Sequence, residues 1–128
     1  MHAITIAELE WFHDAIVESI DYLASEPTTR QLTIVLKCSN DAGTPEWDGK
    51  RVQITADDVV LMRHLVFATS NAESIDAIHE SVSQEMIGMR MKLTSIGAMI
   101  PGKAFTINFH SGSSLELVCK GMLIEMLA

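Results

Sequence analysis

Three features that are scarce in this sequence of 128 residues exclude whole classes of protein. Its only cysteines are Cys38 and Cys119, and no Cys-x-x-Cys pair or Cys/His cluster accompanies them, which argues against a secreted disulfide scaffold. No apolar run comes near the roughly 18–20 residues that a membrane-spanning helix requires. Residues 1–29 contain no Lys or Arg and so lack the basic start of a secretory signal. We therefore predict a cytoplasmic protein without a membrane segment and with both thiols reduced.

Basic residues are scarce as well. Nine Lys and Arg stand against 17 Asp and Glu, for a net charge of −8, and residues 1–29 and 64–89 contain no Lys or Arg at all. Binding to nucleic acid or to an anionic membrane depends on Lys and Arg displacing counterions, so we expect neither partner. The imbalance indicates either a merely solubilising surface or one that attracts a basic protein.

What the sequence does contain is a large apolar fraction. Hydrophobic residues make up 48% of the chain, which predicts an ordered core rather than a disordered segment. The length is typical of one domain, and no internal repeat or Pro/Gly-rich linker divides it. We predict a single domain over residues 1–128.

Alternation of apolar and polar residues predicts that most of this domain is β-strand. The clearest strand covers residues 30–38, where Leu32, Ile34 and Leu36 share one face. Residues 57–68 fit either a strand or a helix, and their β-branched content favours a strand. Further strands are expected from residue 14 to just before Pro27 and at residues 50–56, 89–93, 105–110, 115–119 and 122–127.

Two helices are expected from the spacing of a capping box. The shorter covers residues 6–11 and the longer residues 71–82, in which Ile75, Ile78 and Val82 form an apolar stripe. With so many strands and so few helices, the predicted fold class is α+β: a mostly antiparallel β-sheet or sandwich-like domain with one or two helices. The side chains expected to be buried in its core are Ile34, Leu36, Ile54, Phe105, Ile107, Phe109, Leu115 and Leu117.

Three segments together resemble a family of small bacterial β-rich domains that includes immunity proteins of polymorphic toxin systems. They are Phe12-His-Asp-Ala15 at the start of a strand, Gln31-Leu-Thr-Ile-Val-Leu36 in the next, and His110-Ser-Gly-Ser-Ser-Leu-Glu-Leu117 near the end. The resemblance implies a small β-rich fold and a non-enzymatic protein that binds a partner. It implies no individual site residue.

No pattern of catalytic, metal-binding or cofactor-binding residues stands out. His13 and Asp14 are adjacent, and adjacent residues of a strand point to opposite faces, so we do not expect them to act as an acid/base pair. The five histidines show no H-x-H or H-E-x-x-H spacing, and no phosphate-binding or nucleophile-elbow motif occurs. We predict no cofactor, no metal and no catalytic residue, and we favour a non-enzymatic protein.

Two features are candidates for contact with a protein partner. Glu73, Asp76 and Glu80 fall on one stripe of the expected helix, where like charges repel one another by a few tenths of a kcal/mol. Trp47 lies in an expected turn, where an aromatic side chain either covers the core or anchors a partner. These four residues are the predicted partner-binding site.

The leading functional hypothesis is therefore a protein-binding module of the immunity or regulatory type that recognises a basic partner through an acidic surface. The alternative is a domain that binds a small ligand in a pocket between sheet and helix. A pocket of several hundred Å³ lined by converging polar groups would favour the alternative.

Overall fold

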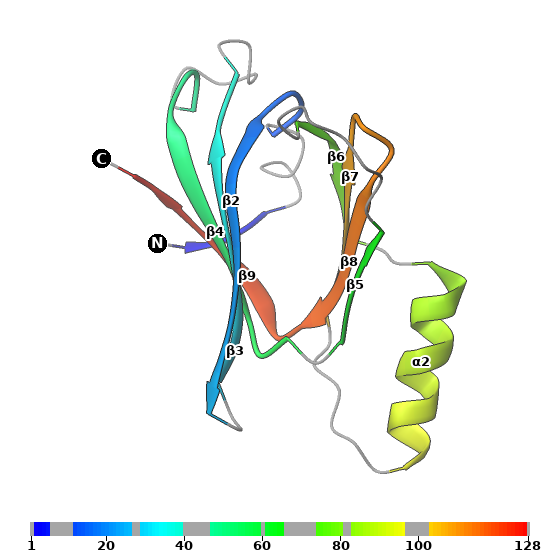
Figure 1. Cartoon of the computed structure of the whole chain (residues 1–128). Coiled ribbons are helices and arrows are strands. Elements are labelled where there is room, and N and C mark those ends of the chain that lie inside the picture. Colours follow the sequence, from blue (N-terminus) through cyan, green and yellow to red (C-terminus); the bar gives the residue numbers. More distant parts are fainter. Residues whose placement is uncertain are drawn as a thin grey trace.

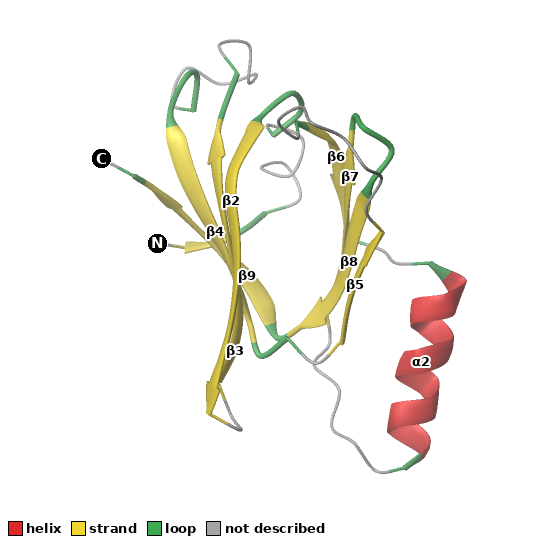
Figure 2. Cartoon of the chain, viewed as in Figure 1, coloured by secondary structure: helices red, strands yellow, loops and turns green. Residues whose placement is uncertain are grey.

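The computed structural model describes residues 2–5, 12–26, 29–39, 47–59, 61–65, 74–80, 83–96 and 103–127. Strands dominate them, and one helix, α2, is present (Figure 2). The elements in chain order are β1 (His2–Ala3), β2 (Ile16–Glu26), β3 (Thr29–Lys37), β4 (Arg51–Asp57), β5 (Leu61–Leu65), β6 (Ile75–His79), α2 (Gln84–Ser95), β7 (Lys103–Phe109), β8 (Ser114–Cys119) and β9 (Gly121–Met126).

The strands form two antiparallel sheets that face each other (Figure 1). The first sheet has the order β1-β9-β4-β3-β2, and the second has the order β5-β8-β7-β6. Glycine at positive φ occurs in the turn just before β4 and in the tight turn that joins β7 to β8: Gly49 has φ 68° and Gly112 has φ 93°. Glycine tolerates this backbone conformation because it has no Cβ.

The two sheets are connected at two corners. At one, β8 leads through Lys120 directly into β9, so the chain passes from the second sheet into the first. At the other, an antiparallel bridge pairs Ile16 with Ser74, which joins the edge strand β2 to the edge strand β6. We call this second corner the seam.

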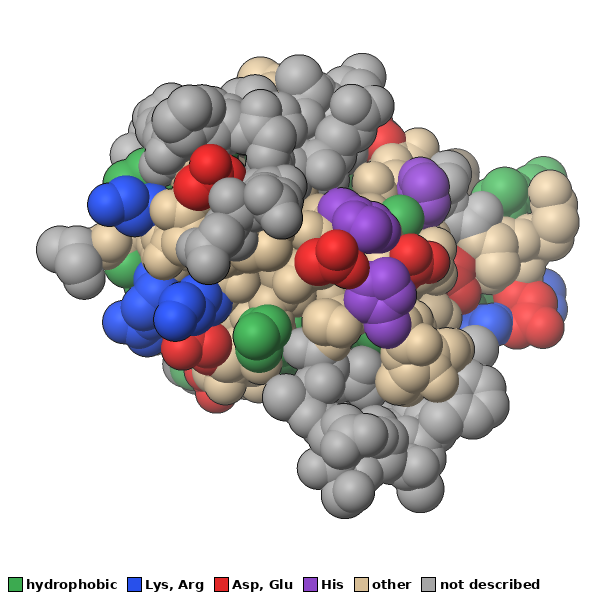
Figure 3. All heavy atoms as spheres, turned by 90° about the horizontal axis from the view of Figure 1, so that it is seen from above, with side chains coloured by type: hydrophobic (Ala, Val, Ile, Leu, Met, Phe, Trp, Pro, Cys, Tyr) green, Lys and Arg blue, Asp and Glu red, His purple; other side chains and the backbone are tan. Residues whose placement is uncertain are grey.

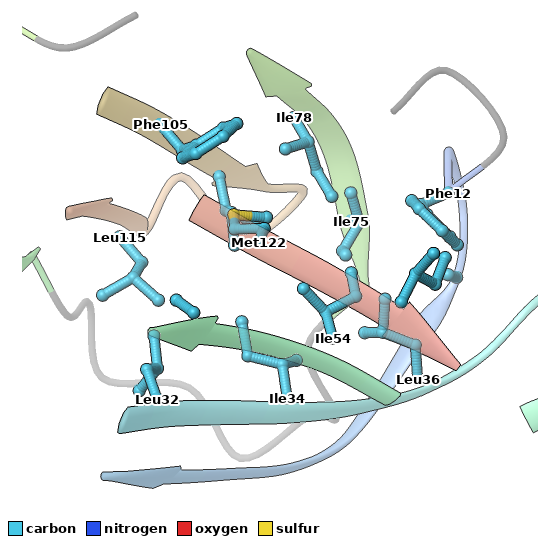
Figure 4. Close-up of a cluster of buried hydrophobic side chains, with 14 of the residues drawn as sticks. Phe12, Leu32, Ile34, Leu36, Ile54, Ile75, Ile78, Phe105, Leu115 and Met122 are labelled. Atoms are coloured by element: carbon cyan, nitrogen blue, oxygen red, sulfur yellow. The ribbon is translucent and has the colours of Figure 1, made fainter. Parts of the chain in front are cut away.

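The core lies between the sheets (Figure 4). Every second residue of a strand points to the same face of its sheet. The buried side chains of β3, β4 and β9 therefore pack against those of β6, β7 and β8. All eight residues that were expected in the core are at most 4% exposed. The prediction of these buried faces is confirmed.

The helix α2 lies outside the second sheet (Figure 1). Met86 is its only described side chain that is fully buried. Ser83 precedes the helix, and its hydroxyl accepts a hydrogen bond from the amide of Met86 at 3.3 Å, as an N-cap residue does. The amide of Ser83 in turn donates to the Glu116 carboxylate of β8 at 2.6 Å. The helix is thus attached by its first turn.

The coarse prediction of a β-rich domain with antiparallel sheets and a helix is confirmed. The strands expected near residues 14–26, 30–38, 50–56, 105–110, 115–119 and 122–127 are present, and residues 61–65 form a strand as favoured. The helix expected over residues 6–11 lies outside the described residues.

Two assignments were wrong. The described part of the expected helix 71–82 contains the strand β6, in which a register shift between Ile75 and Ala77 marks a β-bulge. The extra residue makes Ile75 and Ile78, three positions apart, both point into the core, which imitates a helical stripe. The expected strand 89–93 is part of α2, and Met89 and Met91 alternate with charges without forming a buried face, since they are 38% and 68% exposed.

Candidate functional site

The seam unites the two stretches of chain that lack Lys and Arg. Residues 1–29 supply β2 and the turn before it, and residues 64–89 supply β6. Their exposed acidic residues in the described chain include Asp14, Glu18, Asp21, Asp76 and Glu80, which we call the acidic seam. Among the ion pairs that the structure describes, Glu18 has a Lys or Arg partner, because Arg51 Nε lies 2.6 Å from its carboxylate. None of the described ion pairs joins the remaining four to a Lys or Arg, so they leave negative charge along β2 and β6 and next to the ends of these strands.

Two histidines join the acidic seam at one end of the molecule. Figure 3 looks down on this end and shows histidine and acidic side chains gathered there. His13 belongs to the turn before β2, and His110 to the turn between β7 and β8. Their ring centroids are 5.5 Å apart, with the rings nearly perpendicular at 80°.

Backbone hydrogen bonds hold these turns against the start of β6. The amide of Asp14 donates to the carbonyl of Ile75 at 2.7 Å, and the amide of Ile75 donates to Ala15 at 2.8 Å. The amide of His110 donates to Ser74 at 3.0 Å. Three segments far apart in the sequence are therefore fixed side by side by main-chain contacts, independently of the side chains that they carry.

Each carboxylate of the cluster faces both imidazole rings. Asp14 lies 3.3 Å from His13 Nδ1 and 2.7 Å from His110 Nε2. Asp76 lies 3.8 Å from His13 Nε2 and 3.7 Å from His110 Nδ1. We call these four residues the His/Asp cluster. All of them are between 41% and 59% exposed, so a molecule or ion in solution can reach them.

The expectation that His13 and Asp14 point to opposite faces of a strand was wrong. It assumed that both residues belong to a strand, whereas they lie in a turn in which Asp14 has φ 65°. This left-handed conformation, which Asp adopts more readily than most residues, breaks the alternation of side chains. The bulge at Asp76 has the same effect, because it turns the side chain out of the regular strand pattern.

The predicted partner-binding residues are dispersed by the structure. Asp76 and Glu80 are exposed on and just after β6, whereas Glu73 lies outside the described residues. Trp47 is only 3% exposed and packs edge-on against Phe12, with ring centroids 6.5 Å apart. Of the two roles that the sequence left open for it, the structure shows the one in which it covers the core.

A cavity of about 550 Å³ opens at a different place, beside the connection between β8 and β9. Its charged lining residues are Arg30, Asp57, Asp58, Lys103 and Lys120. The Nε atom of Arg30 is buried and has no hydrogen-bond partner among the described residues. Apolar walls come from residues such as Ile4, Phe105 and Met122. No residue of α2 lines it, so it is not the pocket between sheet and helix that the sequence suggested.

Both cysteines are free thiols, and both are buried. Burial is the main reason that the pKa of Cys38 rises to about 11, and the negative charge of Asp48 adds to the effect. Burial likewise raises the pKa of Cys119 to about 12. Neither thiol is therefore an activated nucleophile.

Comparison with protein-family models, with curated proteins and with solved structures gives no match to this chain. In the part of the chain that the structure describes, no helix is long and apolar enough to span a membrane. The site must therefore be interpreted from its own geometry.

Proposed function

We propose that this protein is a protein-binding module, of the immunity or regulatory type, that recognises a basic partner through the acidic seam. One observation carries the proposal: the fold brings the two stretches without Lys and Arg together at neighbouring sheet edges. A concentrated negative potential steers a positively charged partner toward the surface and accelerates its association.

The strand β2 supplies apolar contacts next to these charges. It is an edge strand of 11 residues, and its side chains Ile20, Tyr22 and Leu23 are 38%, 45% and 52% exposed. Ile20 and Tyr22 pair with the buried Ile34 and Leu32, so they lie on the core side of the sheet without being covered. An edge strand can accept a further strand through its main chain, and exposed tyrosines frequently dominate binding energy.

The proposal is tested with charge-reversed baits. The chain is used to capture proteins from its source cells in parallel with the double variant Asp21→Lys/Glu80→Lys and the control Glu125→Lys, which alters β9 outside the seam. We expect a basic protein that binds the unaltered chain and the control, is lost with the double variant, and associates more slowly as salt is added. Equal recovery by all three baits, or recovery of no protein that depends on the seam, would refute the proposal.

The cavity beside β8 and β9 favours a second candidate function, the binding of a small anionic ligand. Its volume falls in the range of ligand pockets, about 300–1,000 Å³. Arg30, Lys103 and Lys120 outnumber the two carboxylates, and Asp57 already accepts a hydrogen bond from Gln31 at 2.8 Å. Citrate and inorganic phosphate should raise the melting temperature of the unaltered chain, and the variant Lys103→Gln/Lys120→Gln should lose that response. A shift that is the same in both proteins would exclude the cavity as the site.

A further inference from the structure

We propose that the His/Asp cluster is a binding site for a divalent transition-metal ion such as Zn²⁺, with His13, His110 and Asp76 as ligands and Asp14 as their outer-sphere partner. The proposal does not depend on the acidic seam binding a protein. It rests on the positions of four side chains, from three segments of chain, around one point.

The first argument is the convergence of donor atoms. His13, Asp76 and His110 each offer a ligand atom, and these atoms all lie within 4.8 Å of one another. Asp76 is 3.8 Å from His13 Nε2 and 3.7 Å from His110 Nδ1. Metal–ligand bonds of about 2.0–2.1 Å at tetrahedral angles place donor atoms roughly 3.3–3.5 Å apart. Small side-chain rotations would bring the three donors to this spacing.

The second argument is independent of the first and concerns the other nitrogen of each ring. Asp14 lies 3.3 Å from His13 Nδ1 and 2.7 Å from His110 Nε2, the two nitrogens that do not face Asp76. The contact with His110 is a hydrogen bond, and an imidazole that donates from one nitrogen to a carboxylate has its other nitrogen free to bind a metal ion. His13 Nε2 and His110 Nδ1, the nitrogens not nearest to Asp14, both face Asp76.

This arrangement is the one in which a metal-bound histidine usually occurs, with its second nitrogen donating to a carboxylate. His13 Nε2, His110 Nδ1 and the Asp76 carboxylate are the donors that remain on the side away from Asp14. A divalent ion between them would bind all three donor atoms at once. Two imidazole nitrogens and one carboxylate oxygen suit Zn²⁺, Co²⁺ or Ni²⁺ rather than the oxygen-preferring Ca²⁺ and Mg²⁺.

The backbone supports the site without help from a metal. Main-chain hydrogen bonds to Ser74 and Ile75 fix the turns that carry His110 and Asp14. The exposure of the ligands leaves room for water or a fourth ligand on the solvent side. Since no ligand belongs to the core, replacing one of them should leave the fold intact, which makes the site accessible to mutagenesis.

The experiment is a calorimetric titration of the untagged, chelator-treated full chain with zinc chloride. We expect saturable binding of one Zn²⁺ per chain. His110→Ala and Asp76→Asn should abolish it, whereas Asp14→Asn should weaken it roughly 10–100-fold, as loss of an outer-sphere partner does. His79→Ala is the matched control, because His79 is an exposed histidine on the same strand but outside the cluster, and its binding should be unchanged.

Two further measurements separate a metal site from a purely structural ion-pair network. Circular dichroism of every variant verifies the fold, and Co²⁺ should give d–d absorption bands without the intense band of a thiolate ligand, since both cysteines are buried. If the unaltered chain does not bind Zn²⁺ with a Kd below about 1 mM, or if binding survives in His110→Ala, the proposal is wrong. In that case the four side chains form only hydrogen bonds and ion pairs that close the seam.

Discussion

Replacing Glu116 with Ala should release the helix α2 from the second sheet. Glu116 lies between Leu115 and Leu117 on β8, and because these two face the core, its side chain points to the opposite face. It is nevertheless only 4% exposed. Its carboxylate accepts a hydrogen bond from the Ser83 amide at 2.6 Å and lies 3.4 Å from Arg63 Nε.

The size of the effect follows from these two contacts. A hydrogen bond to a charged group contributes about 1.5–3 kcal/mol to the free energy of unfolding. Arg63 is 26% exposed and its Nε makes no proper hydrogen bond, so the ion pair adds no more than about 1 kcal/mol. Glu116→Ala should therefore lower the free energy of unfolding by about 2–4 kcal/mol. Glu116→Gln keeps an acceptor for the Ser83 amide and removes the cost of burying a charge. It should therefore lower the free energy of unfolding by only about 1 kcal/mol.

The assay combines urea unfolding, followed by circular dichroism, with hydrogen exchange of residues 83–96. Glu125→Ala on β9 is the control for loss of a carboxylate elsewhere, and it should change the unfolding free energy by less than about 0.5 kcal/mol. In Glu116→Ala, exchange should accelerate in the first turn of α2 more than in the strands of the second sheet. If Glu116→Ala and Glu125→Ala unfold alike and exchange alike, the carboxylate does not hold the helix and the reasoning is refuted.

Three other substitutions or conditions test the fold more broadly. Ile54 is 1% exposed, so Ile54→Ala should lower the free energy of unfolding by about 2–5 kcal/mol. Ile20 is 38% exposed, and Ile20→Ala should lower it by clearly less. Equal losses in urea unfolding would contradict the description of the core. Cys38 and Cys119 should react slowly with a thiol reagent at pH 8, and rapid labelling of both in the folded protein would contradict their burial. Because burial raises their pKa values to about 11 and 12, the folded state keeps protons that the unfolded chain releases, so the free energy of unfolding should fall as the pH rises above about 9 toward 12. Arg51→Ala should change the melting temperature little, since its pair with Glu18 is exposed and contributes less than about 1 kcal/mol; a loss of several kcal/mol would show that this pair does more than bridge two surface side chains.

The sequence predicted the strands best where one face of a strand is buried along its whole length. In β3, Leu32, Ile34 and Leu36 are buried and the residues between them are not, so simple alternation suffices. The prediction from alternation failed for β6, where one inserted residue changes the spacing of the buried side chains from two positions to three. The prediction failed for α2 because Met86 is the only buried one among the described side chains of this helix, which leaves no apolar stripe to recognise.

The candidate site was far less accessible to sequence reasoning. The four residues of the His/Asp cluster have no motif spacing, since 96 positions separate Asp14 from His110 along the chain. The acidic character of the two stretches was visible, but that they meet at a single corner depends on the pairing of Ile16 with Ser74. Pairing between distant edge strands is set by the packing of the whole core and not by any local pattern.

The two carboxylates of the His/Asp cluster reach the histidines only because the backbone departs from regular structure at both. Asp14 has a positive φ, which for a residue other than glycine costs roughly 1 kcal/mol or more, and Asp76 occupies a bulge that leaves a ladder position unpaired. The bulge in β6 also serves the core, because it lets both Ile75 and Ile78 point inward, whereas the exposed Asp14 packs nothing there. Such irregularities persist where contacts with the surrounding structure hold them in place, and they concentrate at functional sites. Here both irregularities lie at a carboxylate that faces the same pair of imidazole rings, which is the arrangement that a bound cation would require.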